Sequence, residues 1–176
     1  RHVSIKVSAL AGQFKPQSFK YCYEKIAPRL IKILDLAQAK DVFVNVDAEH
    51  YHYRDTVWEV FAEVLRKRGL KQKKAGCGIV VQAYLKDALT HFREIKEFLE
   101  TEEIQHFPIR LVKGAYWDEE TIKAKAHSQA SPQFLNKVET DLCFRHLVRE
   151  ILKTPQTPLC LASHNFSDHC YAEALR

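Results

Sequence analysis

The sequence predicts an α/β fold, and three observations support that prediction. Five short strand-like segments recur along the 176 residues, and most of them are followed by apolar residues at helical spacing. Such alternation is typical of parallel strands joined by right-handed crossovers. The chain has five glycines but no G-x-G-x-x-G turn, which argues against an open, doubly wound nucleotide-binding sheet. We therefore expect a (β/α)8 barrel of the TIM type, in which function lies at the carboxyl ends of the strands.

The first two strands and helices are indicated by changes in hydrophobic period. Residues Val3–Ala9 alternate between apolar and polar side chains, as a half-buried strand does. After a turn near Pro16, one helical stripe contains Ile26, Leu30, Ile33, Leu34 and Ala37. Residues Val42–Ala48 form the second predicted strand, and the stripe that follows contains Val57, Val60, Phe61, Val64 and Leu65.

Three more strands follow in the same way. Residues Gly78–Tyr84 form the third predicted strand, and the helical stripe behind it contains Leu89, Phe92, Ile95 and Leu99. Residues Ile109–Lys113 form the fourth, with one helix beginning near Glu119. A second helix is predicted to begin at Ser131–Pro132, because serine is a common N-cap and proline fits the first helical turn. Residues Leu159–Ser163 form the fifth predicted strand.

Composition limits the class of protein. With 46% hydrophobic and 28% charged residues, the chain suits one globular domain. Its five cysteines are widely spaced and form no C-x-x-C pair, which favours a reducing compartment and argues against a disulfide framework or a zinc knuckle. No apolar run approaches the roughly 18 residues of a membrane span, and no signal-peptide core precedes residue 20. The chain begins with Arg1 and lacks methionine, so we expect a soluble piece of a longer protein.

Much of the formal net charge of +5 comes from one basic run, RKRGLKQKK, at residues 66–74. A run of this kind could bind nucleic acid. It has no interleaved aromatic residues, however, and it lies where a predicted helix leads to a strand. We expect a solvated connector and no nucleic-acid binding through this segment.

Polar side chains recur toward the ends of the predicted strands or on their less apolar face. Buried strand ends have no packing reason to carry polar groups, because an unpaired buried polar group costs about 1–3 kcal/mol. A shared polar site at the mouth of a barrel explains all of them together. They are Lys6, Asp47 with Glu49, Gln82, Arg110 with Lys113, and Ser163 with His164 and Asn165.

Several of these residues also have simpler explanations. Lys6 could point into the barrel or be a frayed terminal lysine, and Asp47 could hold a cation or cap a helix or loop. His50 and His52 form an H-x-H pattern that could ligate a metal, but they follow the strand in a polar stretch, which favours surface histidines. His164 could be a core or loop histidine. No serine stands in a G-x-S-x-G elbow, so the sequence gives no support for nucleophilic hydrolysis.

The most informative segment is PIRLVKGAYWD, at residues 108–118. A short apolar strand carries two cations, Arg110 and Lys113, and a glycine, an alanine and two aromatic residues follow it. Such a segment could be an ordinary strand and loop, or it could form the rim of a site for a flat anionic cofactor. Cations, an amide and aromatic rings with few carboxylates suit an electron-rich ring and a carboxylate substrate better than a divalent metal.

The segments SIKVSAL, FVNVDAE, GIVVQAYLKDAL, PIRLVKGAYWDEETIKA and LASHN occur in this order and resemble the proline dehydrogenase domain of the bacterial bifunctional proline utilization A (PutA) proteins. The resemblance implies a distorted (β/α)8 barrel that binds FAD without a Rossmann domain. It also implies oxidation of L-proline to Δ1-pyrroline-5-carboxylate by hydride transfer to the flavin N5, with a membrane quinone as the electron acceptor.

The resemblance also implies roles for individual residues. Catalytic roles fall to Lys6, which would attract the proline carboxylate, and to Asp47, both at the substrate end. Arg110 would lie near the flavin N5 edge, and Tyr116 would lie against the proline ring. The implied FAD-binding residues are Gln82, Arg110, Lys113, Gly114, Ala115, Tyr116, Trp117, Ser163, His164 and Asn165. Ser163 stands where threonine is common, a change that keeps the hydroxyl.

The resemblance further implies that residues 1–176 are part of a single barrel domain and supply its second to sixth strands, about five βα units. The arginine pair that clamps the substrate carboxylate would lie beyond Arg176, so we expect the chain alone to be inactive. An aldehyde dehydrogenase domain would belong to the same parent chain, which would be cytoplasmic and peripherally associated with the inner membrane. Two alternatives remain: a metal-dependent barrel hydrolase using Asp47, His50, His52 and His164, and a catalytically silent module.

Overall fold

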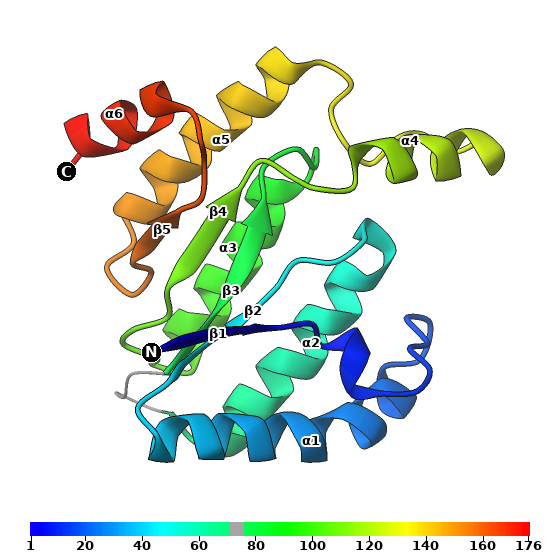
Figure 1. Cartoon of the computed structure of the whole chain (residues 1–176), viewed down its shortest axis with the longest axis vertical. Helices are drawn as coiled ribbons and strands as arrows, with labels where there is room; N and C mark the ends of the chain where they lie inside the picture. The colour runs from blue at the N-terminus through cyan, green and yellow to red at the C-terminus, as the bar shows by residue number, and fades with distance from the viewer. Residues whose placement is uncertain (71–75) are drawn as a thin grey trace. The chain divides into compact units, whose positions relative to one another are not determined.

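The computed structural model describes residues 1–70 and 76–176, and these form two compact units. The first unit contains Arg1–Ile79 with Phe98–Phe107, and the second contains Val80–Glu97 with Pro108–Arg176. The five strands have the order β1-β2-β3-β4-β5 (Figure 1), and the pairs β1–β2, β2–β3 and β4–β5 are parallel. A doubly wound sheet would reverse its order at a switch point, whereas a barrel keeps the order of the chain. The predicted α/β class is confirmed, and the strand order is that of part of a barrel.

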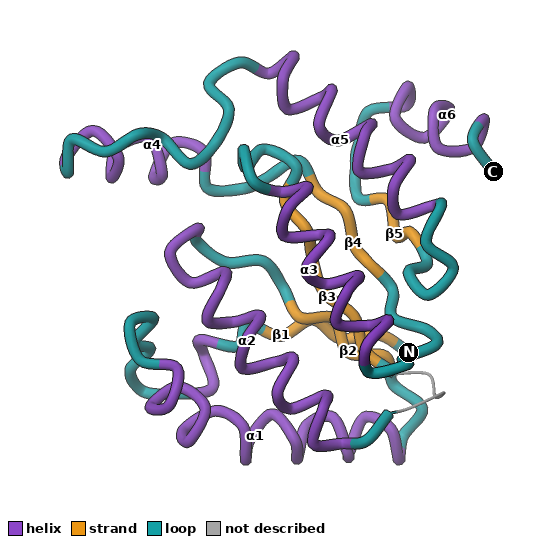
Figure 2. Tube along the Cα trace, turned by 180° about the vertical axis from the view of Figure 1, so that it is seen from behind, coloured by secondary structure: helices purple, strands orange, loops and turns teal. Residues whose placement is uncertain are grey.

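The first unit contains β1 (His2–Ile5), the short 3-10 helix η1 (Ser8–Leu10), α1 (Phe19–Ala39), β2 (Phe43–Val46) and α2 (Tyr51–Arg68). Helix α1 begins where the Ser18 hydroxyl accepts a hydrogen bond from the Tyr21 amide. Helices α1 and α2 pack against each other at an angle (Figure 2), and the predicted apolar stripes are buried, including Ile26, Leu30, Phe61 and Leu65.

Aromatic side chains fill part of the core of the first unit. The rings of Trp58 and Phe98 meet edge to face with their centroids 5.3 Å apart, and those of Phe61 and Phe107 are 5.9 Å apart. Phe61 and Phe107 are completely buried. Edge-to-face and tilted contacts are the preferred geometries of aromatic pairs, so these four rings stabilise the unit beyond their buried area.

The second unit contains the end of β3 (Cys77–Gln82), most of α3 (Ala88–Thr101), β4 (Ile109–Val112), α4 (Trp117–Ala126), α5 (Lys137–Leu152), β5 (Leu159–Leu161) and α6 (Phe166–Ala174). Helix α5 packs on β4 and β5, and α6 packs on α5. The buried face of α5 carries Phe144, Leu147 and Ile151. The carboxyl ends of β4 and β5 therefore lie at one edge of the sheet, on two parallel strands that α5 covers.

Two predicted boundaries are wrong, and one helix was not predicted. The first strand ends at Ile5 instead of Ala9, because the chain turns into η1, where Glu49 binds the Ser8 amide and hydroxyl. Helix α5 begins at Lys137, capped by Asn136, instead of at residue 131. The helix that the sequence analysis does not predict is α6. The other four strands begin and end within two residues of the predicted limits.

Residues 131–134 do not start a helix because they pair with the loop that follows β3. The amide of Phe134 donates to the carbonyl of Tyr84 at 2.8 Å, and the amide of Lys86 donates to the carbonyl of Pro132 at 2.9 Å. A residue preceding a helix can satisfy its backbone groups in this way as well as within a helical turn. The pairing ties the β3 loop to the approach of α5.

The basic run at residues 66–74 begins at the end of α2. Gly69 caps the helix in the left-handed conformation, with φ of 58°, and Arg66 binds Glu102 at 2.9 Å. Residues 71–75 of the predicted connector lie outside the described residues. All five cysteines are free; Cys22, Cys77 and Cys143 are buried, and the other two are exposed. Within the described residues, no helix is long and apolar enough to cross a membrane.

Candidate functional site

The strand ends of the second unit bring predicted site residues together. Gln82 is the last residue of β3 and is buried. Arg110 lies within β4, opposite Cys160 of β5 in the parallel register, and is partly exposed. The backbone of the two residues that follow Gln82 pairs with Val112 and Lys113, at 2.9 and 2.7 Å. The sheet therefore aligns the ends of β3 and β4, as predicted from the barrel rule.

The backbone conformation and close packing at position 114 require glycine. Its φ is 147°, a conformation that other residues rarely adopt, and a Cβ added there would lie 2.3 Å from Cδ1 of Tyr84. The Tyr84 ring thus packs directly against the backbone of the loop after β4. Burial, followed by the negative charge of Glu120, raises the pKa of the Tyr84 hydroxyl, so this group stays protonated at neutral pH.

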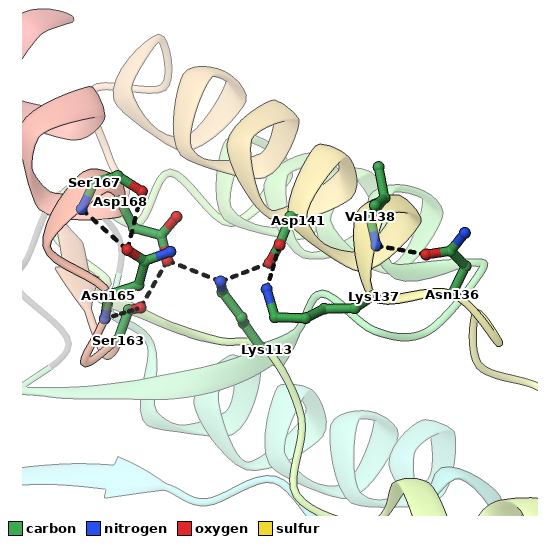
Figure 3. A network of polar contacts seen from close by, with 9 residues as sticks. All are labelled: Lys113, Asn136, Lys137, Val138, Asp141, Ser163, Asn165, Ser167 and Asp168. Carbon is green, nitrogen blue, oxygen red and sulfur yellow. Dashed lines mark hydrogen bonds and ion pairs between the residues drawn. The ribbon is translucent and has the colours of Figure 1, made fainter.

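Lys113 is the centre of an ion-pair network that joins the end of β4 to two helices. Its ammonium lies 2.6 Å from Asp141 in α5 and 3.0 Å from Asp168 in α6 (Figure 3). Asp141 also pairs with Lys137, one turn earlier in α5. The Lys113 side chain is 25% exposed and that of Asp168 only 1%. A buried carboxylate is tolerated only when it is paired and hydrogen-bonded, which Lys113 accomplishes here.

The network also shifts the protonation of its members. Burial by itself lowers the pKa of Lys113, but its hydrogen bonds to Asp141 and Asp168 outweigh burial, and the net pKa is raised. Burial by itself raises the pKa of Asp141, but the two lysines outweigh it and the net pKa is lowered. Both groups are therefore charged across the neutral range.

The loop after β5 carries the last three predicted residues. The Ser163 hydroxyl donates to Asp168 at 2.7 Å and accepts from the Asn165 amide at 3.1 Å. Asn165 caps α6, and its side-chain oxygen accepts from the Ser167 amide at 3.1 Å. His164 is exposed. Ser163 thus joins the Lys113 network, whereas Asn165 has a structural role that leaves its amide nitrogen for other partners.

The residues that follow Gly114 lead into α4. Ala115 is exposed, Tyr116 stands at the N-cap, and Trp117 begins the helix. The indole nitrogen of Trp117 donates to the Phe134 carbonyl at 3.0 Å. Gln133 is buried and donates to the Trp117 carbonyl at 3.1 Å and to the neighbouring Thr121 hydroxyl at 2.7 Å. Gln133 therefore braces the start of α4 against the segment before α5.

A pocket of about 420 Å³ lies at these strand ends in the second unit. This volume is within the range of small-ligand sites, which is about 300–1,000 Å³. Two lysines, two aromatic residues, a threonine, a leucine and a glycine line it. The lining residues are Tyr84, Lys113, Gly114, Trp117, Leu135, Lys137 and Thr140.

The predicted substrate-end residues belong to the first unit. Lys6 follows β1 and is exposed, and Asp47 follows β2, with its amide bound to the Ile5 carbonyl at 2.8 Å. His50 precedes α2 and His52 lies in its first turn, with ring centroids 5.7 Å apart. Among the described residues, no group of three or more histidine, cysteine or acidic side chains is arranged to hold a metal ion.

The first unit has a pocket of its own, of about 340 Å³, on its helical side. It contains none of the residues that the sequence singled out. Its lining residues are Phe19, Trp58, Glu59, Ala62, Glu63, Arg66 and Phe98.

The sequence analysis missed Tyr84, which lines the pocket, and it missed Asp141 and Asp168, which hold Lys113 from behind. Lys137 and Asp141 have the four-residue spacing of a helical ion pair, a signal that could have been found. Asp168 follows Asn165 by three residues, a spacing that is typical of the capped start of a helix. Its contact with Lys113 depends on the packing of α6, which local sequence does not reveal.

Comparison with known families identifies this arrangement. The proline dehydrogenase family profile matches residues 1–176. This chain belongs to the proline dehydrogenase family. It is 32% identical over 157 residues to the bifunctional protein PutA of Escherichia coli strain K12, covering 87% of this chain and 12% of that protein. It is 30% identical over 125 residues to mitochondrial proline dehydrogenase 1 of Drosophila melanogaster, covering 70% of this chain and 18% of that protein.

Solved structures of the family share the fold. PutA from Bdellovibrio bacteriovorus, inactivated by N-propargylglycine, is 34% identical with a TM-score of 0.89, covering 98% of this chain and 18% of that one. The D778Y variant of Bradyrhizobium japonicum PutA is 28% identical with a TM-score of 0.92, covering 99% of this chain and 18% of that one. The chain thus spans less than a fifth of these relatives, and its resemblance to the PutA-type proline dehydrogenase domain is confirmed.

Proposed function

We propose that this chain is part of an FAD-dependent proline dehydrogenase, which oxidises L-proline to Δ1-pyrroline-5-carboxylate. The observation that carries the proposal is the Lys113–Gly114 corner. There a cation and a glycine border a pocket at the strand ends, and the glycine position has no room for a side chain. The chain itself matches the proline dehydrogenase family. A cofactor with an anionic phosphate part and a flat ring suits such a corner.

The residues around the pocket fit FAD in charge and shape. Lys113, Lys137 and the Thr140 hydroxyl lie beside the first turn of α5, where the helix dipole favours an anion. The Trp117 and Tyr84 rings offer flat apolar surface, and Gly114 lets the Tyr84 ring pack directly against the backbone of the loop after β4. These groups would hold the phosphates and one face of the cofactor.

Bound FAD would supply the hydride acceptor at N5, from which electrons would pass to a membrane quinone. Arg110 would place its charge near the N5 edge, and Gln82 would hydrogen-bond the isoalloxazine ring. Tyr116 would lie against the proline ring. Fixed cations and amides ease the arrival of negative charge on a flavin, because they are already oriented when it develops. Ala115, Ser163, His164 and Asn165 would complete the cofactor site.

The substrate end would be formed by Lys6 and Asp47. Lys6 would attract the proline carboxylate. Residues 1–176 would supply the second to sixth strands of the barrel. The rest of the parent protein would supply the other strands, the arginine pair that binds the substrate and an aldehyde dehydrogenase domain. We infer a cytoplasmic protein that associates peripherally with the inner membrane and binds no nucleic acid through this segment.

The test replaces Arg110 and Lys113 separately by methionine in the full-length protein. Each loss of a charge-assisted bond, about 1.5–3 kcal/mol, should lower FAD retention or the rate of flavin reduction by proline about tenfold or more. Lys153→Met is the matched control, because Lys153 is 65% exposed and pairs only on the surface with Glu150. Flavin absorbance of the purified protein and stopped-flow reduction by proline give the two readouts. Unchanged flavin content and reduction rates in both variants would refute the site.

Two further measurements extend the test. Lys6→Ala should raise the KM for proline while FAD stays bound, as loss of a ground-state contact does. The 176-residue chain alone, given FAD, should turn over no proline in a dye-reduction assay. About one zinc or manganese per chain, lost when His50 and His52 are changed together, would favour the hydrolase alternative instead.

A further inference from the structure

The buried carboxylate of Asp168 lies directly behind two residues of the proposed cofactor site. Its Oδ2 is 3.0 Å from the Lys113 ammonium and accepts the Ser163 hydroxyl at 2.7 Å (Figure 3). Lys113 follows β4 and Ser163 follows β5, whereas Asp168 belongs to α6. One carboxylate oxygen thus joins the ends of two neighbouring strands.

The geometry of Lys113 shows what this contact achieves. An ammonium group has three donor protons. One is directed to Asp141 and one to Asp168, and the Phe144 ring lies on another side, 5.4 Å from Nζ. The third donor remains for the pocket that Lys113 lines. Two fixed contacts therefore determine the direction of the third.

The two carboxylates are not equivalent. Asp141 is 27% exposed and divides its charge between Lys113 and Lys137, so it holds Lys113 less firmly and water can replace part of its contact. Asp168 is almost completely buried, and water cannot substitute for it without entering the fold. Asp168 is therefore the stronger constraint on the position of Lys113.

Asp168 also determines which hydrogen bond Ser163 can make. Because the Ser163 hydroxyl gives its proton to Asp168 and accepts from the Asn165 amide, it retains one lone pair. Toward a ligand it can act only as an acceptor. A ligand N–H or O–H group is the partner that this arrangement fits.

We propose that Asp168 is a positioning residue of the cofactor site, which aims the Lys113 ammonium and orients the Ser163 hydroxyl as an acceptor. The inference rests on the proposed FAD site. It assigns no direct contact between Asp168 and the cofactor. The carboxylate acts mainly through Lys113 and, to a smaller extent, through Ser163, so most of its effect must disappear when Lys113 is removed.

A double-mutant cycle on the full-length protein tests this dependence. Asp168→Asn should raise the Kd of the apoprotein for FAD about tenfold, as expected when a charge-assisted bond is lost, and Asp141→Asn should raise it less than about threefold. In a Lys113→Met background, Asp168→Asn should change the Kd less than about twofold. Equal losses in both backgrounds would indicate a merely structural role and overturn the proposal, as would an unchanged or lower Kd for Asp168→Asn alone.

A second readout needs no cofactor. Competitive acetylation of the apoprotein, followed by mass spectrometry, reports how strongly each lysine is held. Asp168→Asn should accelerate acetylation of Lys113 severalfold and leave Lys137, which is 75% exposed, unchanged. If Asp168→Asn does not fold, Asp168→Glu replaces it in both assays and should give an intermediate effect, because it keeps the charge but displaces it. Wild-type rates at Lys113 would overturn the proposal.

The two readouts separate this inference from the proposed function. A wild-type protein that binds no FAD, but whose Lys113 is released by Asp168→Asn, would refute the cofactor and keep the positioning of the lysine. A protein that binds FAD and shows additive mutations would keep the function and refute the role of Asp168.

Discussion

Each unit buries a carboxylate downstream of a strand, but the two carboxylates hold different partners. Glu49, after β2 in the first unit, is 7% exposed and accepts hydrogen bonds from the Ser8 amide, at 3.0 Å, and from the Ser8 hydroxyl. Asp168, after β5 in the second unit, accepts from the Ser163 hydroxyl and pairs with the Lys113 ammonium. The first arrangement fixes the loop after β1, and the second fixes a charge.

One glycine in each unit shows a similar difference. Gly114, after β4, has a positive φ and stands against the Tyr84 ring, whereas Gly12, after η1, has no atom within 4 Å of a Cβ placed on it. Close packing at the strand ends of the second unit therefore constrains both charge and backbone. The loop after η1, in contrast, leaves room for a side chain at Gly12.

Gly114→Ala should have the largest effect. The added methyl would overlap the buried Tyr84 ring in a backbone conformation that alanine disfavours, and overpacking plus backbone strain should cost about 2–5 kcal/mol of unfolding free energy. Gly12→Ala should change the unfolding free energy by less than about 0.5 kcal/mol. Urea unfolding of both variants measures the difference. Equal effects would show that the two loops are constrained alike.

Exchanging each buried carboxylate for its amide should have the next largest effect. Asp168→Asn leaves Lys113 with Asp141 as its remaining carboxylate partner in the network, and should cost about 1–3 kcal/mol. Glu49→Gln keeps an acceptor oxygen for Ser8 and should cost about 0.5–1.5 kcal/mol. The same unfolding assay at neutral pH ranks the two. A larger loss from Glu49→Gln would contradict the distinction between fixing a loop and fixing a charge.

The pH dependence of two other carboxylates should have opposite signs in the two units. The folded pKa of Asp141 lies below its ordinary 3.8, so its ion pairs stabilise the fold above that pH and are lost as pH falls through the folded pKa. The folded pKa of Glu59 lies above its ordinary 4.5, because of burial and then the charge of Asp55. Ionised Glu59 therefore costs stability above its folded pKa, and the cost vanishes below about pH 4.5.

Asp141→Asn should accordingly destabilise the protein at pH 7, by a few tenths to about 1 kcal/mol, with the loss disappearing in acid. Glu59→Gln should stabilise it at pH 7, and that gain should also disappear in acid. Urea unfolding between pH 3 and pH 8 tests both signs. Parallel curves for the two variants and the wild type would rule out the electrostatic origin assigned to either group.

Much of the fold could be predicted because it depends on local pattern. The period of two in the strands and of 3.6 in the helices located all five strands and placed Gln82, Arg110 and Lys113 at neighbouring strand ends. The predicted ends of helices and strands were wrong where tertiary contacts outweighed local conformational preference. Ser131–Pro132 has the residues of a helix start, yet its segment pairs with the loop after β3.

The partners of the site residues could not be predicted for the same reason. Lys113 was singled out as a cofactor cation, but Asp141 lies 28 residues away and Asp168 lies on a helix with no recognised stripe. Tyr84 was read as the end of a strand. Its packing against Gly114 becomes visible only when the β3 and β4 ends are aligned. Sequence patterns locate the groups that face a ligand more readily than those that hold them from behind.

Arg66→Gln should have the smallest effect and tests the comparison from the surface of the first unit. Arg66 binds Glu102 at 2.9 Å and covers the Phe98 ring, with its guanidinium carbon 5.4 Å from the ring centre, but its side chain is 51% exposed. Exposed pairs contribute about 0.2–1 kcal/mol and weaken with salt. Unfolding in low and high salt should therefore show a small, salt-sensitive loss. The Lys113 side chain is 25% exposed and that of its partner Asp168 only 1%. Lys113→Met should therefore lower the unfolding free energy more than Arg66→Gln does, and the loss should depend less on salt. If Arg66→Gln costs as much as Lys113→Met, burial of the partner is not what makes the Lys113 network stronger.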